Sequence, residues 1–144
     1  MSTRLTRSLL ALALLAALPA SLRAQAADSL AFPRQVLKWF NTSQADSLFA
    51  HSGEQMKARM QSAANVTGMM AQLAEQVGEQ KALEGEYQFD KDGQKVYIAV
   101  ARFSKQADPG AFVVQYAPGS TVFDRFGVMP LARAKELFPE AKLP

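Results

Sequence analysis

Asp124 is the side chain best placed in this sequence for proton transfer. It lies in an alternating segment and falls on the same side of a predicted strand as Val122, Phe126 and Val128. A carboxyl group among apolar neighbours has a raised pKa, which suits a general acid or base at neutral pH. A structural interpretation competes with this one and is the one we favour: Asp124 pairs with Arg102, or a β-bulge turns it to solvent.

Four other side chains could contribute polar groups to a pocket. Tyr97 and Tyr116 could offer hydroxyls and Arg102 could bind an acid, although buried tyrosines often have a hydroxyl at the rim for structural reasons alone. His51 is the only histidine and could act as a general base. No carboxylate stands at a helical spacing to orient it. The simpler interpretation is an exposed histidine that interacts with the dipole at a helix C-terminus.

Several classes of site lack the residues they need. The chain has no cysteine and a single histidine, and a hairpin turn already explains the neighbouring Asp90 and Asp92. We therefore predict no metal site and no cofactor.

No nucleophile elbow, phosphate loop or dinucleotide fingerprint occurs, which argues against a hydrolase or a nucleotide enzyme. A set of methionines could adapt to an apolar ligand but fills cores more often. Its members are Met56, Met60, Met69, Met70 and Met129.

Residues 1–26 have the three-part order of a cleavable secretory signal peptide. Two arginines precede the apolar run 8–18, and small residues predict cleavage after Ala26, with cleavage after Ala24 as the nearest alternative. The run stops at Pro19, short of the roughly 20 apolar residues that a membrane span requires. We expect a periplasmic or secreted product that meets the membrane only during export. It should carry no lipid anchor, since there is no cysteine to attach one.

Cleavage at this position changes the charge balance. It removes three arginines, so Lys and Arg fall from 16 to 13 and balance the 13 Asp and Glu, leaving a net charge of zero. The net positive charge of the whole chain thus comes from the three arginines of the signal peptide. Because the mature chain has no excess of positive charge, a nucleic-acid partner is not expected. The remaining 118 of 144 residues suffice for one domain, which must be stabilised by packing because no disulfide can form.

The mature chain changes character near residue 80. Before it, apolar residues recur every three or four positions, which predicts three or four short helices. Ser52 and Gln55 have the spacing of a capping box, and Asn65 or Thr67 could cap the following helix. After residue 80, alternating apolar and polar residues and Gly-containing turns predict four strands joined as an antiparallel meander. These strands are expected at 83–89, 96–101, 112–116 and 121–129.

This order predicts an α+β domain over residues 27–130. Its N-terminal helices should cover one face of a four-stranded antiparallel meander sheet. Residues 96–101 are apolar at every position, as expected of a strand covered on both sides. Residues 131–144 should form a loosely held C-terminal tail, with one or two helical turns that stop at Pro139.

With this order the sequence resembles the nuclear-transport-factor-two-like superfamily, also called ketosteroid-isomerase-like or cystatin-like. More narrowly, it resembles an uncharacterised exported bacterial domain of that superfamily. The resemblance covers roughly residues 32–130 and implies a curved, cone-like sheet and an accessory role. In other branches the open end of the cone holds a small apolar ligand, and a few branches isomerise or dehydrate it. The likeness lies in Trp39-Phe40, Asp46 to Phe49, Met56, Met60, Met70, Leu73, Gln76 and Phe126 to Pro130.

Three functions follow as hypotheses. The leading one is a non-catalytic exported accessory or binding module, which holds a small apolar molecule or meets an envelope protein. The second is a small isomerase or dehydratase with Asp124 as base and Tyr97 or Tyr116 as proton donor, which requires these side chains to meet in one cavity. The third is a homodimer that associates through its sheet, suggested by the two-sided apolarity of residues 96–101.

Overall fold

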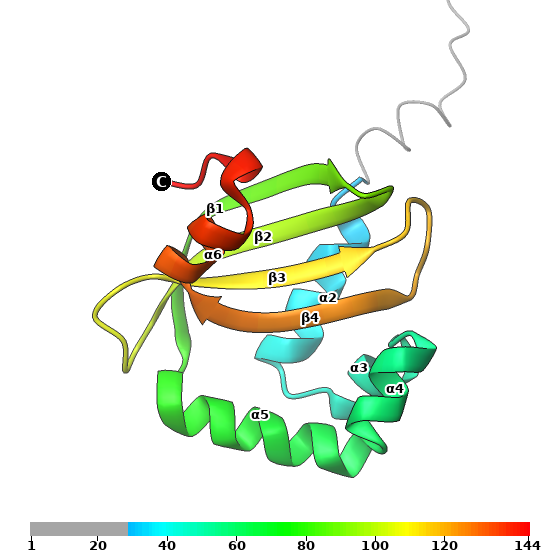
Figure 1. Cartoon of the computed structure of the whole chain (residues 1–144). Helices are drawn as coiled ribbons and strands as arrows, with labels where there is room; N and C mark the ends of the chain where they lie inside the picture. The colour runs from blue at the N-terminus through cyan, green and yellow to red at the C-terminus, as the bar shows by residue number, and fades with distance from the viewer. Residues whose placement is uncertain (1–28) are drawn as a thin grey trace, which may run out of the picture.

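The computed structural model describes residues 29–144, so the predicted signal peptide at 1–26 lies outside the described residues. Four helices precede a four-stranded antiparallel sheet and a fifth follows it, which confirms the α+β prediction (Figure 1). None of the helices within this part of the chain has the length and apolarity needed to cross a bilayer. The elements are α2 (Ala31–Asn41), α3 (Ala45–Ala50), α4 (Glu54–Met60), α5 (Ala63–Val77), β1 (Gln80–Lys91), β2 (Gln94–Phe103), β3 (Gly110–Tyr116), β4 (Phe123–Pro130), α6 (Leu131–Leu137) and the short 3-10 helix η1 (Pro139–Ala141).

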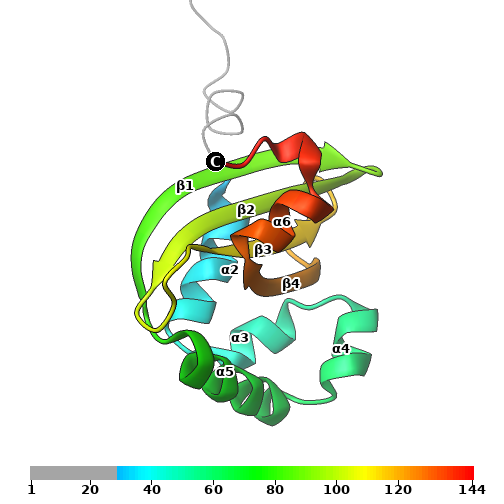
Figure 2. The ribbon, with the colours of Figure 1, turned by 60° about the vertical axis from the view of Figure 1, so that its left-hand side comes forward.

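The sheet is the predicted meander, with strand order β1-β2-β3-β4. Strands β1 and β2 meet in a two-residue turn at Asp92 and Gly93, whose φ angles of 52° and 78° suit a left-handed turn. Two register shifts interrupt the pairing of β1 with β2. Figure 2 shows that the sheet is curved, most clearly along β1.

Two hydrophobic cores lie on opposite faces of this sheet. The inner face carries Tyr97 and Phe112 and packs against helices α2, α3 and α5. For example, the rings of Phe40 and Phe112 have centroids 5.2 Å apart. The outer face carries Val96, Ile98 and Val100 of β2 and packs against α6, so the strand has no solvent-exposed side at its centre. The two-sided apolarity of residues 96–101 is thereby explained within one chain.

The C-terminal residues differ from the prediction. Residues 131–144 are not a loosely held tail, because α6 lies across the outer face of the sheet (Figures 1 and 2). Ala134 and Phe138 are buried there, with 0% and 6% of their surface exposed. The helices therefore cover both faces of the sheet, instead of the single face expected.

The predicted helix caps are also wrong. Helix α4 begins after Gly53, and no side chain caps it. Ser52 is buried and donates its hydroxyl to the carbonyl oxygen of Leu48 at 2.6 Å, so it is not free to form a capping box with Gln55. Helix α5 is capped by Ser62, whose Oγ accepts the backbone N–H of Asn65 at 3.2 Å.

Candidate functional site

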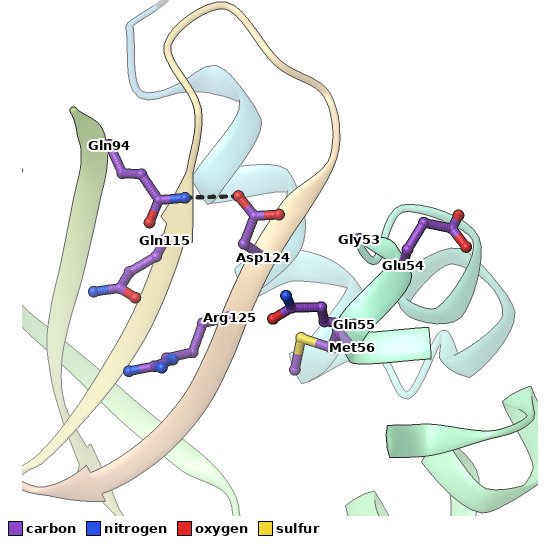
Figure 3. Close-up of a pocket in the computed structure, with 8 residues that line it drawn as sticks. All are labelled: Gly53, Glu54, Gln55, Met56, Gln94, Gln115, Asp124 and Arg125. Carbon is purple, nitrogen blue, oxygen red and sulfur yellow. Dashed lines mark hydrogen bonds between the residues drawn. The ribbon is translucent and has the colours of Figure 1, made fainter. Parts of the chain in front are cut away.

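Asp124 lies in a polar cleft of about 460 Å³ at the β4 edge of the sheet (Figure 3). Its carboxylate accepts a hydrogen bond from Gln94 Nε2 at 2.8 Å. The cleft is formed by the start of α4 and by strands β2, β3 and β4, and amide and charged side chains dominate its lining. The lining residues are Gly53, Glu54, Gln55, Met56, Gln94, Gln115, Asp124 and Arg125.

A β-bulge explains why Asp124 lies there. Gln115 pairs with Arg125 and Tyr116 pairs with Phe123, so Asp124 is an extra residue in β4. Phe123 therefore turns into the inner core, while Asp124 is exposed beside a side chain of the outer face. The prediction that Asp124 shares an apolar side with Phe126 is wrong. The alternative prediction, that a β-bulge turns Asp124 to solvent, is confirmed.

Arg102 does not pair with Asp124. Its guanidinium binds the carboxylate of Glu84 and donates to the carbonyl oxygen of Ala107 at 3.2 Å. Arg102 lies near the C-terminal end of β2, whereas Gln94, the partner of Asp124, begins that strand. The two predicted site residues are thus at opposite ends of the sheet.

Tyr97 belongs to a polar cluster on the inner face. Its hydroxyl donates to Glu86 Oε1 at 2.6 Å, and Arg34 binds the same carboxylate through Nε and Nη2 at 2.9 and 2.8 Å. Burial raises the pKa of Tyr97, and the bond to the carboxylate of Glu86 raises it further. The hydrogen bond from Arg34 holds the pKa of Glu86 below its usual range. Because the Tyr97 hydroxyl already donates to Glu86 and Arg34 binds the same carboxylate, this cluster joins α2 to β1 and β2.

Tyr116 also points to the inner face. Its hydroxyl accepts a bond from Gln88 Nε2 and donates to the carbonyl oxygen of Ser29 at 3.4 Å. Burial raises the pKa of Tyr116 as well. Both tyrosine hydroxyls are therefore separated from Asp124 by the sheet. The structure does not bring together the acid and base that an isomerase or dehydratase would use.

We expect Tyr97 to make stability depend on alkaline pH. Because its pKa is raised in the folded state, its contribution is complete below the unfolded value of about 10 and is lost as the pH rises above it. The free energy of unfolding, measured by denaturant titration between pH 8 and 11, should fall above pH 10. Tyr97→Phe should show a flatter alkaline decline than the parent protein, and equal slopes would contradict this assignment.

His51 occupies the C-terminal end of α3, as the structural interpretation predicts, although it is half-buried instead of exposed. Its Nδ1 lies 2.9 Å from the carbonyl oxygen of Ser47, which can only accept, so Nδ1 carries the proton in this bond. The imidazole stacks on Trp39 with 4.4 Å between ring centroids. These contacts give His51 a structural role at the end of the helix.

A second cavity, the α5 groove, has a volume of about 470 Å³. It lies between α5, the end of α2 and the adjoining ends of β1 and β2. Six of its eleven lining residues are apolar, but polar groups contribute slightly more of its exposed surface, mostly from exposed residues at the rim. The lining residues are Phe40, Asn41, Ser43, Met70, Leu73, Ala74, Val77, Gly78, Glu79, Gln80 and Phe103.

Backbone hydrogen bonds fix the C-terminal end of α5 beside this groove. The amide of Lys105 donates to the carbonyl oxygen of Val77 at 3.0 Å, and the amide of Ser104 donates to that of Glu79 at 2.9 Å. Ser104 Oγ accepts the amide of Glu79 at 3.0 Å. The β2–β3 loop therefore holds the junction between α5 and β1 in place through these hydrogen bonds. Sequence patterns did not indicate this connection.

The methionine set is divided among different environments. Met60 is in the inner core, and Met129 packs on the outer one. Met56 lines the polar cleft and Met70 the α5 groove, while Met69 is 42% exposed. The set is therefore not one ligand surface.

Within residues 29–144, no three His, Asp or Glu side chains are grouped so that they could hold a metal ion. No family model, curated protein or solved structure matches this chain. The interpretation of its function therefore rests on its own geometry.

Proposed function

We propose that the mature chain is an exported, non-catalytic binding module that holds a small apolar molecule in the α5 groove. The observation that carries the proposal is the groove itself. Its volume of about 470 Å³ falls within the range of about 300–1,000 Å³ that is common for small-molecule sites. Its combination of apolar side chains with a few hydrogen-bonding groups is also found at such sites.

The positions of the candidate acids and bases favour binding over catalysis. Asp124 is exposed in the polar cleft, and the hydroxyl of Tyr97 is occupied by Glu86 on the other face of the sheet. None of the predicted site residues lines the α5 groove. We therefore do not retain the isomerase or dehydratase hypothesis.

Association through the sheet has lost its original support. The apolar residues of β2 that suggested a homodimer are covered by helices of the same chain on both faces. Each of residues 96–101 is at most 1% exposed without any partner. If the groove holds no ligand, binding to an envelope protein is the alternative function.

Filling the groove should weaken ligand binding. Leu73 lines it, whereas Met69 is exposed on the same helix and does not. We expect Leu73→Trp to lower affinity for an uncharged apolar probe such as N-phenyl-1-naphthylamine at least about tenfold, equivalent to about 1.4 kcal/mol. Met69→Trp should leave the affinity unchanged. Equal affinities in the two variants, both shown to be folded by circular dichroism, would place the probe elsewhere.

Native mass spectrometry of protein produced with its N-terminal segment in a bacterial host would test the rest of the proposal. A mass that corresponds to cleavage after Ala26, in protein recovered from the periplasm or medium, is expected. Organic extraction of the same sample should release a retained apolar molecule. Uncleaved protein that stays in the cytoplasm would contradict export.

A further inference from the structure

The polar rim of the α5 groove has a definite chemistry. Asn41 Nδ2 donates to Gln80 Oε1 at 3.0 Å, which holds two amide groups together at the surface. This bond uses one donor and one acceptor. Each amide carries two donors and an oxygen with two lone pairs, so the pair retains both kinds of group for a ligand. Ser43 adds a hydroxyl to the same lining.

Charge is nearly absent from the lining. Glu79 is the one ionisable residue among those that form the groove within the described chain. Its carboxylate is paired with Lys81 Nζ at 3.0 Å, and this hydrogen bond lowers the pKa of Glu79. The rim therefore holds a carboxylate that stays ionised at neutral pH and is already balanced by an ammonium group.

These groups discriminate among ligand head groups. A carboxylate or phosphate head at this exposed rim would lie near the carboxylate of Glu79, which repels it, and no cation belongs to the lining to attract it. An ammonium head would have to compete with Lys81 for the carboxylate of Glu79, the one anionic group in the lining. A hydroxyl or amide head can form hydrogen bonds with the Asn41 and Gln80 amides, and it brings no charge near Glu79.

We propose that the α5 groove selects uncharged amphiphiles, molecules with an apolar body and one neutral hydrogen-bonding head group. This inference rests on the proposed function and specifies its ligand class. The apolar body lies against Met70, Leu73 and Phe103, and the head group meets the amide pair at the rim. Fatty acids and alkylammonium ions are poor ligands for the same groove.

Three probes with the same chain test the selectivity: decan-1-ol, decanoate and decylammonium, titrated into the mature protein at pH 7 and followed by native mass spectrometry. Decan-1-ol should bind at least about tenfold more tightly than either ion. Decanoate binding as tightly as decan-1-ol would overturn the selectivity while leaving the binding function intact. Binding of none of the three would overturn both proposals.

Two variants separate the roles of the rim groups. Gln80→Leu removes one amide and should reduce the advantage of decan-1-ol over decanoate to about threefold or less. Lys81→Met frees the carboxylate of Glu79 and should raise the affinity for decylammonium several-fold without changing that for decan-1-ol. Lys135→Met, an exposed substitution on α6, controls for the loss of one positive charge. The same response to Lys81→Met and Lys135→Met would overturn the role of Glu79.

Discussion

Replacing Gly78 by alanine is expected to lower the free energy of unfolding by about 3 kcal/mol, whereas the same replacement at Gly119 should cost about 1 kcal/mol. Both glycines have positive φ angles, 77° and 74°. They differ in the space around them. A Cβ atom on Gly78 would overlap Ser104 Oγ and lie 3.1 Å from the backbone nitrogen of Lys105, while nothing lies within 4 Å of one on Gly119.

The cost at Gly78 has two parts. Its φ of 77° and ψ of −158° belong to a region that is accessible almost only to glycine. In addition, Ser104 cannot move away without giving up the bond in which its Oγ accepts the amide of Glu79. The backbone of Lys105 blocks the other direction. The junction that holds α5 beside the groove therefore depends on this glycine.

Chemical denaturation of the two single variants measures the difference, and the double variant Gly78→Ala/Ser104→Ala separates the two parts. Removing the serine hydroxyl should relieve the contact but not the backbone strain, so the double variant should remain less stable than Ser104→Ala alone. Equal losses for Gly78→Ala and Gly119→Ala would show that the close contact with Ser104 has no energetic consequence.

Phe138→Ala is expected to destabilise the protein by about 3–4 kcal/mol, in the range for removing a buried aromatic ring. Phe138 is 6% exposed and packs edge-on against Phe89, with 5.9 Å between the ring centroids. Lys91 Nζ lies over the Phe138 ring, 5.2 Å from its centroid. The ring thus fastens the C-terminal residues to the outer face of β1.

The neighbouring Leu137 provides a matched control, because it is 40% exposed. Leu137→Ala should cost less than about 1 kcal/mol, as surface substitutions usually do. Thermal and denaturant unfolding of both variants checks the contrast. A loss below 1 kcal/mol for Phe138→Ala as well would mean that residues 131–144 contribute little to the fold, as the sequence had suggested.

The features that local patterns encode were predicted well. The hairpin at Asp92 and Gly93 requires only that glycine follow a polar residue between two alternating segments. The buried central strand follows from an apolar side chain at every position of residues 96–101. The helical turns after residue 130 were predicted, but their apolar face was overlooked: Leu131, Ala134 and Phe138 recur at helical spacing among charged residues.

The errors at the candidate site come from contacts between distant segments. The backbone of Phe123 bonds to His51 and Gly53, forming an isolated parallel bridge with Ser52 at the edge of β4. The strand accommodates this bridge next to a one-residue bulge, which reverses the side on which Asp124 lies. No pattern within 121–129 contains this information.

The partners of Glu86 in β1 could not be predicted for the same reason. Glu86 alternates with apolar neighbours and resembles a residue on a wet face. In the structure it faces inward, where Arg34 and Tyr97 satisfy its carboxylate. Strand alternation gives the side of the sheet but does not identify a partner that comes from a helix many residues away.

The order of elements along the chain also determines when each part can become stable during synthesis. Helices α2 to α5 emerge first, but the inner core in which they are buried also needs Tyr97, Phe112 and Phe123. Each strand, by contrast, pairs only with its neighbours in sequence, so hairpins can form as soon as two strands are available. The helices of the first half of the chain must therefore wait for the strands of the second half before they gain lasting structure.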